Sequence, residues 1–396
     1  MTQCTNFLSR EPVRAALSGA VAMAVAMGIG RFFYTPVLPG MMTGLGLDAA
    51  EAGVIAAANF AGYLLGALLA AHGWATGRER PLAIGALAAT VLLLFAMALA
   101  SDVAVLSVIR FLAGLASAFA MIFTSGIVLS IGLSHGDPRV QRAHFSGVGC
   151  GIAVSAVLVY VLSLVPPTAI SPWRIDWLAG GLLGAVGLAA VALLLPRPAA
   201  QADSRREPSI RWTRPLVALT ASYGLFGIGY VVTATFIVAI ARAGAHDPLL
   251  ECLTWLVTGA AAAISLFAWR PVERRLGVAA TYLAALLLEA VGVAATVVLP
   301  FPASALIGGA LLGFTFMIVT AYGLQLGRRL ASDSPRQVLA LMTAAFGVGQ
   351  IVGPLGAGIL AAQTGSYVLP SLVAAGVLLI AAVTVVAGGA LSIKSP

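Results

Sequence analysis

Charged side chains are scarce in this chain. They make up 9% of its 396 residues, whereas hydrophobic residues make up 60%. Soluble proteins carry about a quarter of charged residues, and a single core that stops growing near about 250–300 residues could not bury this much apolar surface. Charge-free stretches at 111–134, 143–173 and 215–241 each exceed the roughly 20 residues that cross a bilayer as a helix. The sequence therefore excludes a water-soluble protein.

Cysteine and histidine are also few. Cys4, Cys150 and Cys252 lie far apart, and neither they nor the four histidines follow the spacing of a metal site. The sequence contains no H-E-x-x-H or G-x-S-x-G motif and no phosphate-binding loop of the G-x-x-x-x-G-K type. We therefore expect no metal, no cofactor and no ATP-driven activity. Pairing of a serine with a histidine across helices stays open, which leaves an intramembrane enzyme as a distant alternative.

Long apolar stretches dominate the chain instead. Division at charges, at proline and glycine clusters and at polar turns predicts an all-α membrane protein with twelve transmembrane helices. Their expected ranges are 15–40, 50–72, 82–100, 103–132, 144–165, 174–195, 215–241, 250–269, 278–299, 304–327, 337–362 and 368–391.

The positive charges mark one side of the membrane. Loops that face the cytoplasm carry an excess of arginine and lysine. In this chain the connections from even to odd helices are basic, whereas the opposite connections hold only Arg174 and Arg242. The central connection, 196–214, carries Arg197, Arg205, Arg206, Arg211 and Arg214. The net charge of +8 is thus a topology signal rather than a nucleic-acid site, and we expect both termini in the cytoplasm of a bacterium.

The two halves of the chain resemble each other. Residues 28–30 (GIG) recur at 227–229, and residues 147–149 (GVG) recur at 347–349, so the matches share an offset near 200 residues. A shared offset indicates parallel repeats, which are typical of secondary transporters whose solute site lies between the halves. We therefore expect two pseudo-symmetric six-helix bundles. Their expected bounds are 1–195 and 215–396, with 196–214 as a cytoplasmic basic linker.

Three segments resemble one known family. Residues 27–39 (MGIGRFFYTPVLP), 223–230 (YGLFGIGY) and 344–354 (AAFGVGQIVGP) are similar to the YbfB/YjiJ branch of the major facilitator superfamily. The overall pattern of twelve helices in paired halves resembles that superfamily along essentially the whole chain. The resemblance implies the major facilitator fold and a transporter that works by alternating access. It carries no information about the substrate.

Two superfamily motifs imply a coupling mode. Arg110, Gly114 and Ala118 match the R-x-x-x-G-x-x-x-A motif of the fourth helix, which is associated with proton coupling. Residues 147–152 resemble the glycine-rich antiporter motif of the fifth helix, although Ser155 stands at a glycine position and the usual proline is missing. The resemblance therefore implies export coupled to protons.

Arg31 stands out because it lies in an apolar span. An ionised side chain there costs at least about 2.5–3.5 kcal/mol and by default marks a functional site. We expect Arg31, and also Arg110 at a similar depth, to bind a carboxylate or another anion through the planar guanidinium fork. The alternative is a structural ion pair with one of three acids near the helix ends, namely Asp48, Glu51 and Asp102.

Glu289 is the carboxylate that falls about halfway along a predicted span, the ninth. A carboxyl group removed from water there is a candidate proton carrier, together with Arg110. The alternative is a neutral acid bonded to a neighbouring helix.

Other polar and aromatic residues are predicted to line a cavity between the halves. Residues 32–34 could stack on an aromatic solute, but aromatic residues near helix ends more often anchor the chain at the membrane interface, and we expect that role. Glycines such as Gly62 and Gly114 are expected to let helices pack closely. The remaining candidates for substrate binding are Tyr34, Asn59, Tyr63, Tyr223, Tyr230, Thr233, Thr320, Gln325, Phe346 and Gln350.

These observations predict a secondary active transporter. We expect it to move a small organic solute by alternating access, with proton-coupled efflux as the first hypothesis and proton-coupled uptake of an anionic, carboxylate metabolite as the alternative. The expected partners are the solute, protons and the lipid bilayer, with no nucleic acid, and the expected state is a monomer.

Overall fold

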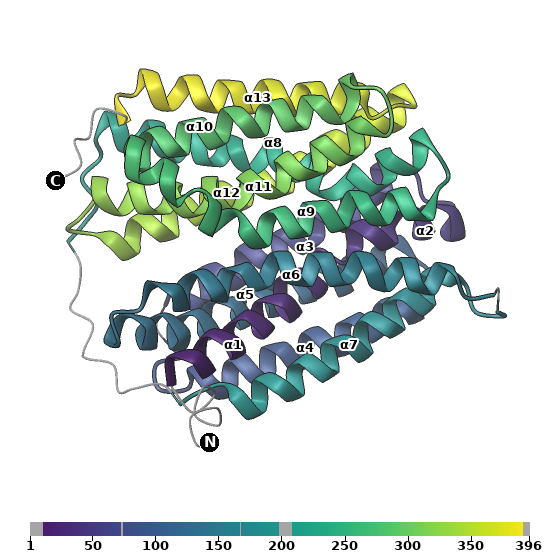
Figure 1. Ribbon diagram of the computed structural model, residues 1–396, viewed down its shortest axis with the longest axis horizontal. Coiled ribbons are helices and arrows are strands. Elements are labelled where there is room, and N and C mark those ends of the chain that lie inside the picture. The colour runs from purple at the N-terminus through teal and green to yellow at the C-terminus, as the bar shows by residue number, and fades with distance from the viewer. Residues whose placement is uncertain (1–10, 73, 167, 198–207, 391–396) are drawn as a thin grey trace, which may run out of the picture.

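The computed structural model describes residues 11–72, 74–166, 168–197 and 208–390. Within these ranges the chain forms helices joined by short turns and contains no strand (Figure 1). Twelve helical segments in the described residues are long and apolar enough to cross a membrane, and we call them spans. The predicted all-α fold with twelve transmembrane helices is therefore confirmed.

The first span is interrupted, whereas most of the others are continuous helices. Three elements build the first span, namely α1 (Glu11–Met23), the π-helical η1 (Ala24–Ile29) and α2 (Tyr34–Leu45). The first half continues with α3 (Ala49–Ala70), α4 (Glu79–Leu99), α5 (Val103–Ser134), α6 (Pro138–Ser163) and α7 (Pro172–Leu194). The second half comprises α8 (Arg214–Gly244), α9 (Pro248–Ala268), α10 (Arg270–Val298), α11 (Ala303–Leu330), α12 (Pro335–Thr364) and α13 (Val368–Ala387). Residues 198–207 of the expected linker lie outside the described residues.

Two helices begin six or more residues earlier than the sequence predicts. The expected start of the fifth span was residue 144, but α6 begins at Pro138 because the Asp137 carboxylate accepts a hydrogen bond from the Arg139 amide at 2.9 Å and caps the helix. The ninth span was expected from residue 278. There α10 begins at Arg270, and Gly277, with a φ of 77°, separates a short basic turn from the apolar span.

Each half packs mainly on itself. In Figure 1 the helices of the first half (purple to teal) lie below those of the second half (green to yellow). The halves meet where α3 packs on α12, α6 on α9, and α2 on α8. We call this boundary the seam. The pairs α3–α12 and α6–α9 join equivalent helices, because the second span of each half meets the fifth span of the other.

Glycines allow backbones to meet closely across the seam. A Cβ atom on Gly149 of α6 would lie 2.2 Å from the Ala263 amide nitrogen of α9. A Cβ atom on Gly53 of α3 would lie 2.4 Å from the Pro354 carbonyl oxygen of α12. Since no larger side chain fits these distances, the backbones of the two halves approach each other directly at these glycines.

Glycines also allow close backbone contacts between helices inside the first half. A Cβ atom on Gly62 of α3 would lie 1.8 Å from the Phe111 carbonyl oxygen, and one on Gly114 of α5 would lie 1.9 Å from the Asn59 carbonyl oxygen. The predicted close-packing role of Gly62 and Gly114 is confirmed.

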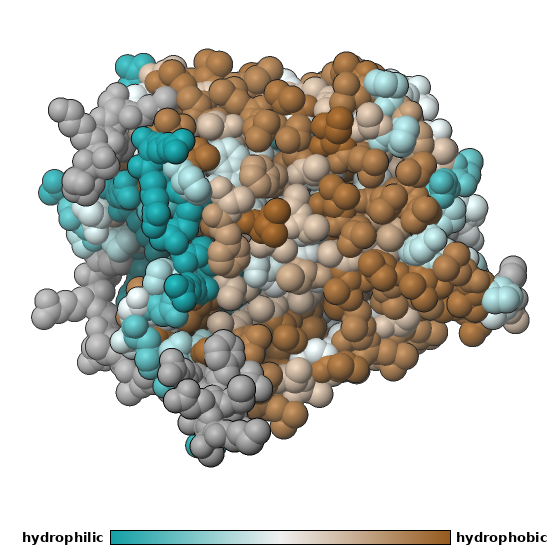
Figure 2. All heavy atoms as spheres, viewed as in Figure 1, coloured by the Kyte–Doolittle hydropathy of each residue, from teal (hydrophilic) through white to brown (hydrophobic). Residues whose placement is uncertain are grey.

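The two ends of the molecule differ in charge. At one end, where α1 begins and α13 ends, Figure 2 shows hydrophilic side chains, while a hydrophobic surface covers the helices beside it. We call this end the basic end. It carries Arg139, Arg142, Arg270, Arg274, Arg275, Arg328 and Arg329, which lie at the ends of α6, α10 and α11.

The opposite end of the seam is held shut by side chains. The Thr35 hydroxyl of α2 donates to the Ala234 carbonyl of α8 at 2.7 Å, and the Tyr367 hydroxyl contacts Met42 Sδ at 3.9 Å. Burial raises the pKa of Tyr367 to about 12, so this hydroxyl stays neutral. Within the described residues α5 makes no substantial packing contact with α11 or α12, although Arg142 of α6 lies over the Phe267 ring of α9, at 5.6 Å, near the basic end.

Candidate functional site

The break in the first span is tied to the fourth span by Arg110. The π-helical η1 and the turn after it disturb the hydrogen-bond ladder, a feature often found at functional sites. The guanidinium of Arg110 donates to the Gly30 carbonyl from Nη1 at 3.1 Å and to the Arg31 carbonyl from Nη2 at 2.8 Å. Arg110 is 2% exposed, and its ring contacts are Tyr34, at 5.1 Å, and Trp177, at 6.0 Å. Arg110 therefore holds in place the turn between η1 and α2 that contains Arg31.

Arg31 is buried without an acidic partner. It is 4% exposed, and no ion pair joins it to an acid among the described residues. Its guanidinium carbon lies 4.2 Å from the centre of the Tyr63 ring and 4.6 Å from that of Phe60, which is the geometry of a cation–π contact. Arg31 is therefore held on aromatic faces and not by a countercharge.

The acids proposed as structural partners are used elsewhere. Asp48 and Glu51 form a reciprocal cap at the start of α3, and Asp102 accepts from the amides of Ala104 and Val105 at the start of α5. The structure thus gives no support to a structural ion pair of Arg31 with any of these acids.

One edge of the Arg31 guanidinium remains available. Its Nε and Nη2 atoms are buried and have no hydrogen-bond partner in the described part of the chain. These two N–H groups point the same way and match the two oxygens of a carboxylate. A cavity of about 10 Å³, large enough for about one water molecule, borders Arg31, and Arg110, Ala234 and Thr235 line it as well.

Across the seam the second half presents a stack of aromatic rings. The Tyr230 ring lies nearly parallel to that of Phe316, at 6.0 Å and 4°, and to that of Phe346, at 5.6 Å and 6°. Tyr223 stacks on Phe346 at 5.1 Å. From the first half, Phe32 reaches Phe316 edge-on at 6.2 Å. Aromatic faces therefore lie on both sides of the seam at the level of Arg31.

Tyr230 connects this stack to the polar groups. Its hydroxyl accepts a hydrogen bond from the Gln350 side-chain amide and lies within electrostatic range of Arg31. The Gln350 side-chain oxygen and the Thr233 hydroxyl are buried without a partner in the described residues. The site therefore combines one cationic edge, several ring faces and two unpaired polar atoms.

The structure brings some predicted residues together and leaves others in packing roles. Arg31, Tyr63, Tyr230, Phe346 and Gln350 form the cluster just described, with Tyr223 stacked behind it and Tyr34 beside Arg110. Three others are not part of this cluster. Asn59 donates to the Arg110 carbonyl at 2.9 Å, the Thr320 hydroxyl donates to the Phe316 carbonyl, and Gln325 is half-buried on α11.

Two aromatic residues of the site were missed in the sequence, and one expected role was wrong. Phe60 and Phe316 were not singled out, although Phe60 lies three residues before Tyr63 and therefore on the same helix face. Residues 32–34, expected as anchors at the membrane interface, are 6%, 0% and 2% exposed in the interior. The anchor expectation fails because the broken first span turns these rings toward α7 and the seam.

Glu289 lies inside the second half. It is 0% exposed on α10, and neither carboxylate oxygen has a hydrogen-bond partner in the residues described. The Thr315 hydroxyl of α11 lies beside it but already donates to the Leu311 carbonyl at 2.6 Å. Glu289 is within electrostatic range of Tyr230 and Tyr282. A charge on Glu289 would therefore be felt at the aromatic stack.

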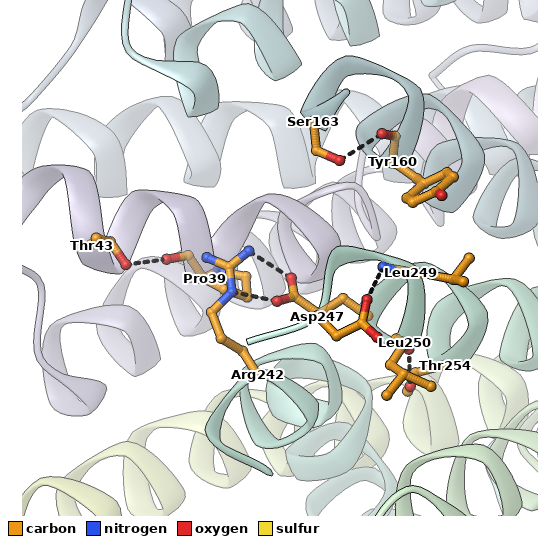
Figure 3. A network of polar contacts seen from close by, with 10 residues as sticks. Pro39, Thr43, Tyr160, Ser163, Arg242, Asp247, Leu249, Leu250 and Thr254 are labelled. Atoms are coloured by element: carbon orange, nitrogen blue, oxygen red, sulfur yellow. Dashed lines mark hydrogen bonds and ion pairs between the residues drawn. The ribbon is translucent and has the colours of Figure 1, made fainter. Parts of the chain in front are cut away.

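A second polar cluster lies at the opposite end of the seam. Figure 3 shows Arg242 of α8 among residues of α2, α6 and α9. Its guanidinium donates to both oxygens of Glu251 at 2.6 Å, and Asp176 of α7 lies within electrostatic range of it. The pair borders a cavity of about 60 Å³ that residues from both halves line. This cluster was not predicted from the sequence, although Glu251 follows Glu51 by 200 residues, which is the offset of the repeat.

The comparisons with known proteins agree with this architecture. The family described as "Uncharacterised MFS-type transporter YbfB" matches residues 23–386. No curated protein matches the chain. The fold is similar to that of a mutant of the nucleoside transporter NupG, with a TM-score of 0.76 and 13% identity over 94% of this chain and 99% of that one.

A second solved structure is similar as well. It is a bacterial homologue of the human lysosomal transporter Spinster in an inward-facing, unoccupied conformation, with a TM-score of 0.72 and 12% identity over 98% of this chain and 99% of that one. Identities this low show that the fold is shared and carry nothing about the solute.

Proposed function

The chain belongs to the MFS family described as uncharacterised MFS-type transporter YbfB, and on that premise we propose that it exports a small organic solute in exchange for protons. Membership in this family makes it a membrane transporter of some solute and not an enzyme. The direction, the coupling to protons, the monomeric state and the location in the inner membrane belong to the proposal.

The observation that carries the proposal is the free edge of Arg31. A buried guanidinium with two unpartnered N–H groups is costly in an apolar span, and the cost is removed when an anion or a polar solute binds there. Arg31 lies at the seam, beside α8 of the other half, which is where secondary transporters bind their solutes.

The seam also supports alternating access. Its closest backbone approaches are made at glycines, which allow two helices to rock there without moving large side chains. The opposite end is shut by Thr35 and Tyr367, so the solute reaches Arg31 from the basic end. By the positive-inside rule the basic end faces the cytoplasm, and the solute therefore enters this state from the cell interior.

Two features favour protons as the coupling ion and export as the direction. Glu289 is a fully buried carboxyl group without a hydrogen-bond partner among the described residues, and its charge would act on Tyr230 in the solute site. A proton that binds or leaves Glu289 would thus change the affinity for the solute. The glycine-rich stretch that favours export packs tightly, since a Cβ atom on Gly147 would lie 2.0 Å from the Ala20 carbonyl oxygen of α1.

Uptake of a carboxylate metabolite together with protons is the second candidate. The observation that favours it is the same Arg31 edge, because two parallel N–H groups match a carboxylate better than a neutral solute. In this candidate the proton compensates the negative charge of the solute.

Transport in proteoliposomes tests both candidates. The purified protein is reconstituted with a pH gradient, and the movement of a panel of radiolabelled organic solutes is followed together with internal pH. Loss of a solute against its gradient as protons enter supports export, and accumulation with protons supports uptake. No response of any solute to the pH gradient contradicts both.

A variant of Glu289 tests the coupling. Glu289→Gln retains the size and the neutral form of the side chain but cannot release a proton. We expect this variant to exchange solute across the membrane while losing the response to the pH gradient. A full response to the gradient in Glu289→Gln would exclude Glu289 as the proton carrier.

A further inference from the structure

We propose that the solute of this site is an aromatic monocarboxylate whose ring carries a hydroxyl or amino group. The proposal rests on the proposed function, since it names the class of solute that the transporter binds at Arg31. Three independent features of the site carry it: the free guanidinium edge, the aromatic faces on both sides of the seam, and the unpaired polar atoms of the second half.

The carboxylate is recognised from both halves. Arg31 of the first half offers Nε–H and Nη2–H side by side, which matches a carboxylate in two parallel hydrogen bonds. Tyr230 of the second half lies within electrostatic range of Arg31, and its hydroxyl oxygen already accepts from Gln350. The hydroxyl proton of Tyr230 is therefore left to donate to the same carboxylate.

The site offers a free two-donor edge to one carboxylate group rather than to two. Arg110, the neighbouring cation, donates from Nη1 and Nη2 to the carbonyls of Gly30 and Arg31, and its Nε alone has no partner in the described residues. Only Arg31 therefore presents two parallel N–H groups, and the second anionic group of a dicarboxylate would find no such edge. A neutral amide of similar shape has one carbonyl oxygen in place of two carboxylate oxygens, so it would pair less completely with the two N–H groups of the Arg31 edge.

The aromatic residues around the site indicate that the solute contains an aromatic ring. Phe60 and Tyr63 lie on the side of Arg31, and the nearly parallel rings of Tyr230, Phe316 and Phe346 lie on the other. The rings of the second half stack on one another and Arg31 covers Phe60 and Tyr63, so a flat ring would enter by exchanging these contacts for its own offset stacking, which stabilises it beyond the burial of its area. The Phe32–Phe316 contact, which crosses the seam, is the place where such a ring would separate the halves.

Two unpaired polar atoms of the second half indicate that the ring carries a polar substituent. The Gln350 side-chain oxygen and the Thr233 hydroxyl are buried without a partner in the described residues, and Thr233 lies one helical turn after Tyr230. A hydroxyl or amino group on the ring would pair with them. A plain benzoate ring would leave them unpaired, which weakens its binding.

Binding to the purified full-length protein tests this class. The probes are 4-hydroxybenzoate, benzoate, cyclohexanecarboxylate and 4-hydroxybenzamide, each titrated by calorimetry at constant ionic strength. We expect 4-hydroxybenzoate to bind tightest, and benzoate and cyclohexanecarboxylate to bind successively about 3–10-fold more weakly. The neutral amide should bind at least about 30-fold more weakly than 4-hydroxybenzoate. Equal binding of the amide, or of the cyclohexane acid, would overturn the proposal.

Arginine variants tie the binding to this site. Arg31→Lys retains the charge but loses the paired N–H groups, and we expect affinity for 4-hydroxybenzoate to fall about 10-fold or more. The matched control is Arg174→Lys on α7, because Arg174 also lies against an aromatic ring, at 4.8 Å from Trp173, but away from the site. Equal losses in both variants, with both folded, would contradict a specific role of Arg31.

Flux measurements separate this proposal from the function on which it rests. Uptake of radiolabelled 4-hydroxybenzoate is measured in proteoliposomes, and protein-free liposomes correct for diffusion of the neutral acid. If 4-hydroxybenzoate neither binds nor moves but another solute responds to the pH gradient, the aromatic carboxylate is wrong and the transporter function stands. If no solute responds, the proposed function fails as well.

Discussion

Arg110 donates a hydrogen bond from Nη2 to the backbone carbonyl of Arg31 at 2.8 Å. The two arginines therefore have different roles. Arg110 uses its Nη groups to satisfy carbonyls where the first span is broken, and Arg31 keeps a free edge at the seam. Because Arg110 is bonded to the backbone of Arg31, the position of the free guanidinium depends on the bonded one.

Loss of the two hydrogen bonds from Arg110 to the carbonyls of Gly30 and Arg31 should destabilise the interrupted first span. In Arg110→Lys one ammonium group cannot reproduce two directed bonds to carbonyls, and we expect the free energy of unfolding to fall by about 1–3 kcal/mol. Thermal unfolding in detergent measures this. Solute binding should weaken as well, since Arg31 loses its fixed position. Unchanged stability with unchanged binding would show that Arg110 does not hold the break.

Gly114 and Gly126 on α5 form a matched pair. A Cβ atom at Gly114 would meet the Asn59 carbonyl oxygen at 1.9 Å, whereas one at Gly126 would find nothing within 4 Å. We expect Gly114→Ala to destabilise the protein by about 1–3 kcal/mol or more through overpacking, and Gly126→Ala to leave Tm unchanged or slightly raised. Similar Tm values for the two variants would refute the close approach of α3 and α5.

The ion pair of Arg242 and Glu251 should couple the ends of α8 and α9. Its two bonds of 2.6 Å and the 9% exposure of the Glu251 side chain make it stronger than an exposed pair. Removal of one partner leaves the other partly buried and unpaired, so we expect Glu251→Gln to cost about 1–3 kcal/mol.

The double variant provides the control for this pair. Arg242→Gln combined with Glu251→Gln should cost less than the sum of the single substitutions, because no charge is then stranded. Additive losses in thermal unfolding would mean that the two side chains do not interact.

The orientation in the membrane can be tested by labelling. Ser332 is exposed at the basic end and Thr168 is exposed at the other. In a chain whose own cysteines are replaced by serine, an impermeant maleimide added to intact cells should label Thr168→Cys but not Ser332→Cys. After permeabilisation both should react. The reverse pattern would place the basic end outside the cell and reverse the direction from which the solute enters the described state.

The positions of the helices were predictable, and their ends were less so. Span positions follow from hydropathy, which is a property of neighbouring residues along the chain. The early starts at Pro138 and Arg270 were missed because polar first turns extend a helix beyond its apolar part. The cap of Asp137 was readable in principle from the Asp-Pro pair.

The candidate site was predictable only in part. Arg31 could be singled out because a charge inside an apolar run is expensive wherever the chain folds. Phe60 and Phe316 could not, because aromatic residues are common in membrane helices and nothing local distinguishes those that face the seam. The same reason explains why residues 32–34 were misjudged.

The sequence by itself determined that this chain lies in a membrane with twelve spans, that its halves are related, and that Arg31 is exceptional. Only the tertiary structure decided which arginine is bonded and which is free, that no acid pairs with Arg31 among the described residues, and which rings face it. The physical reason is that hydrophobicity acts residue by residue along the chain. The partner of a buried side chain depends instead on how helices far apart in sequence pack together.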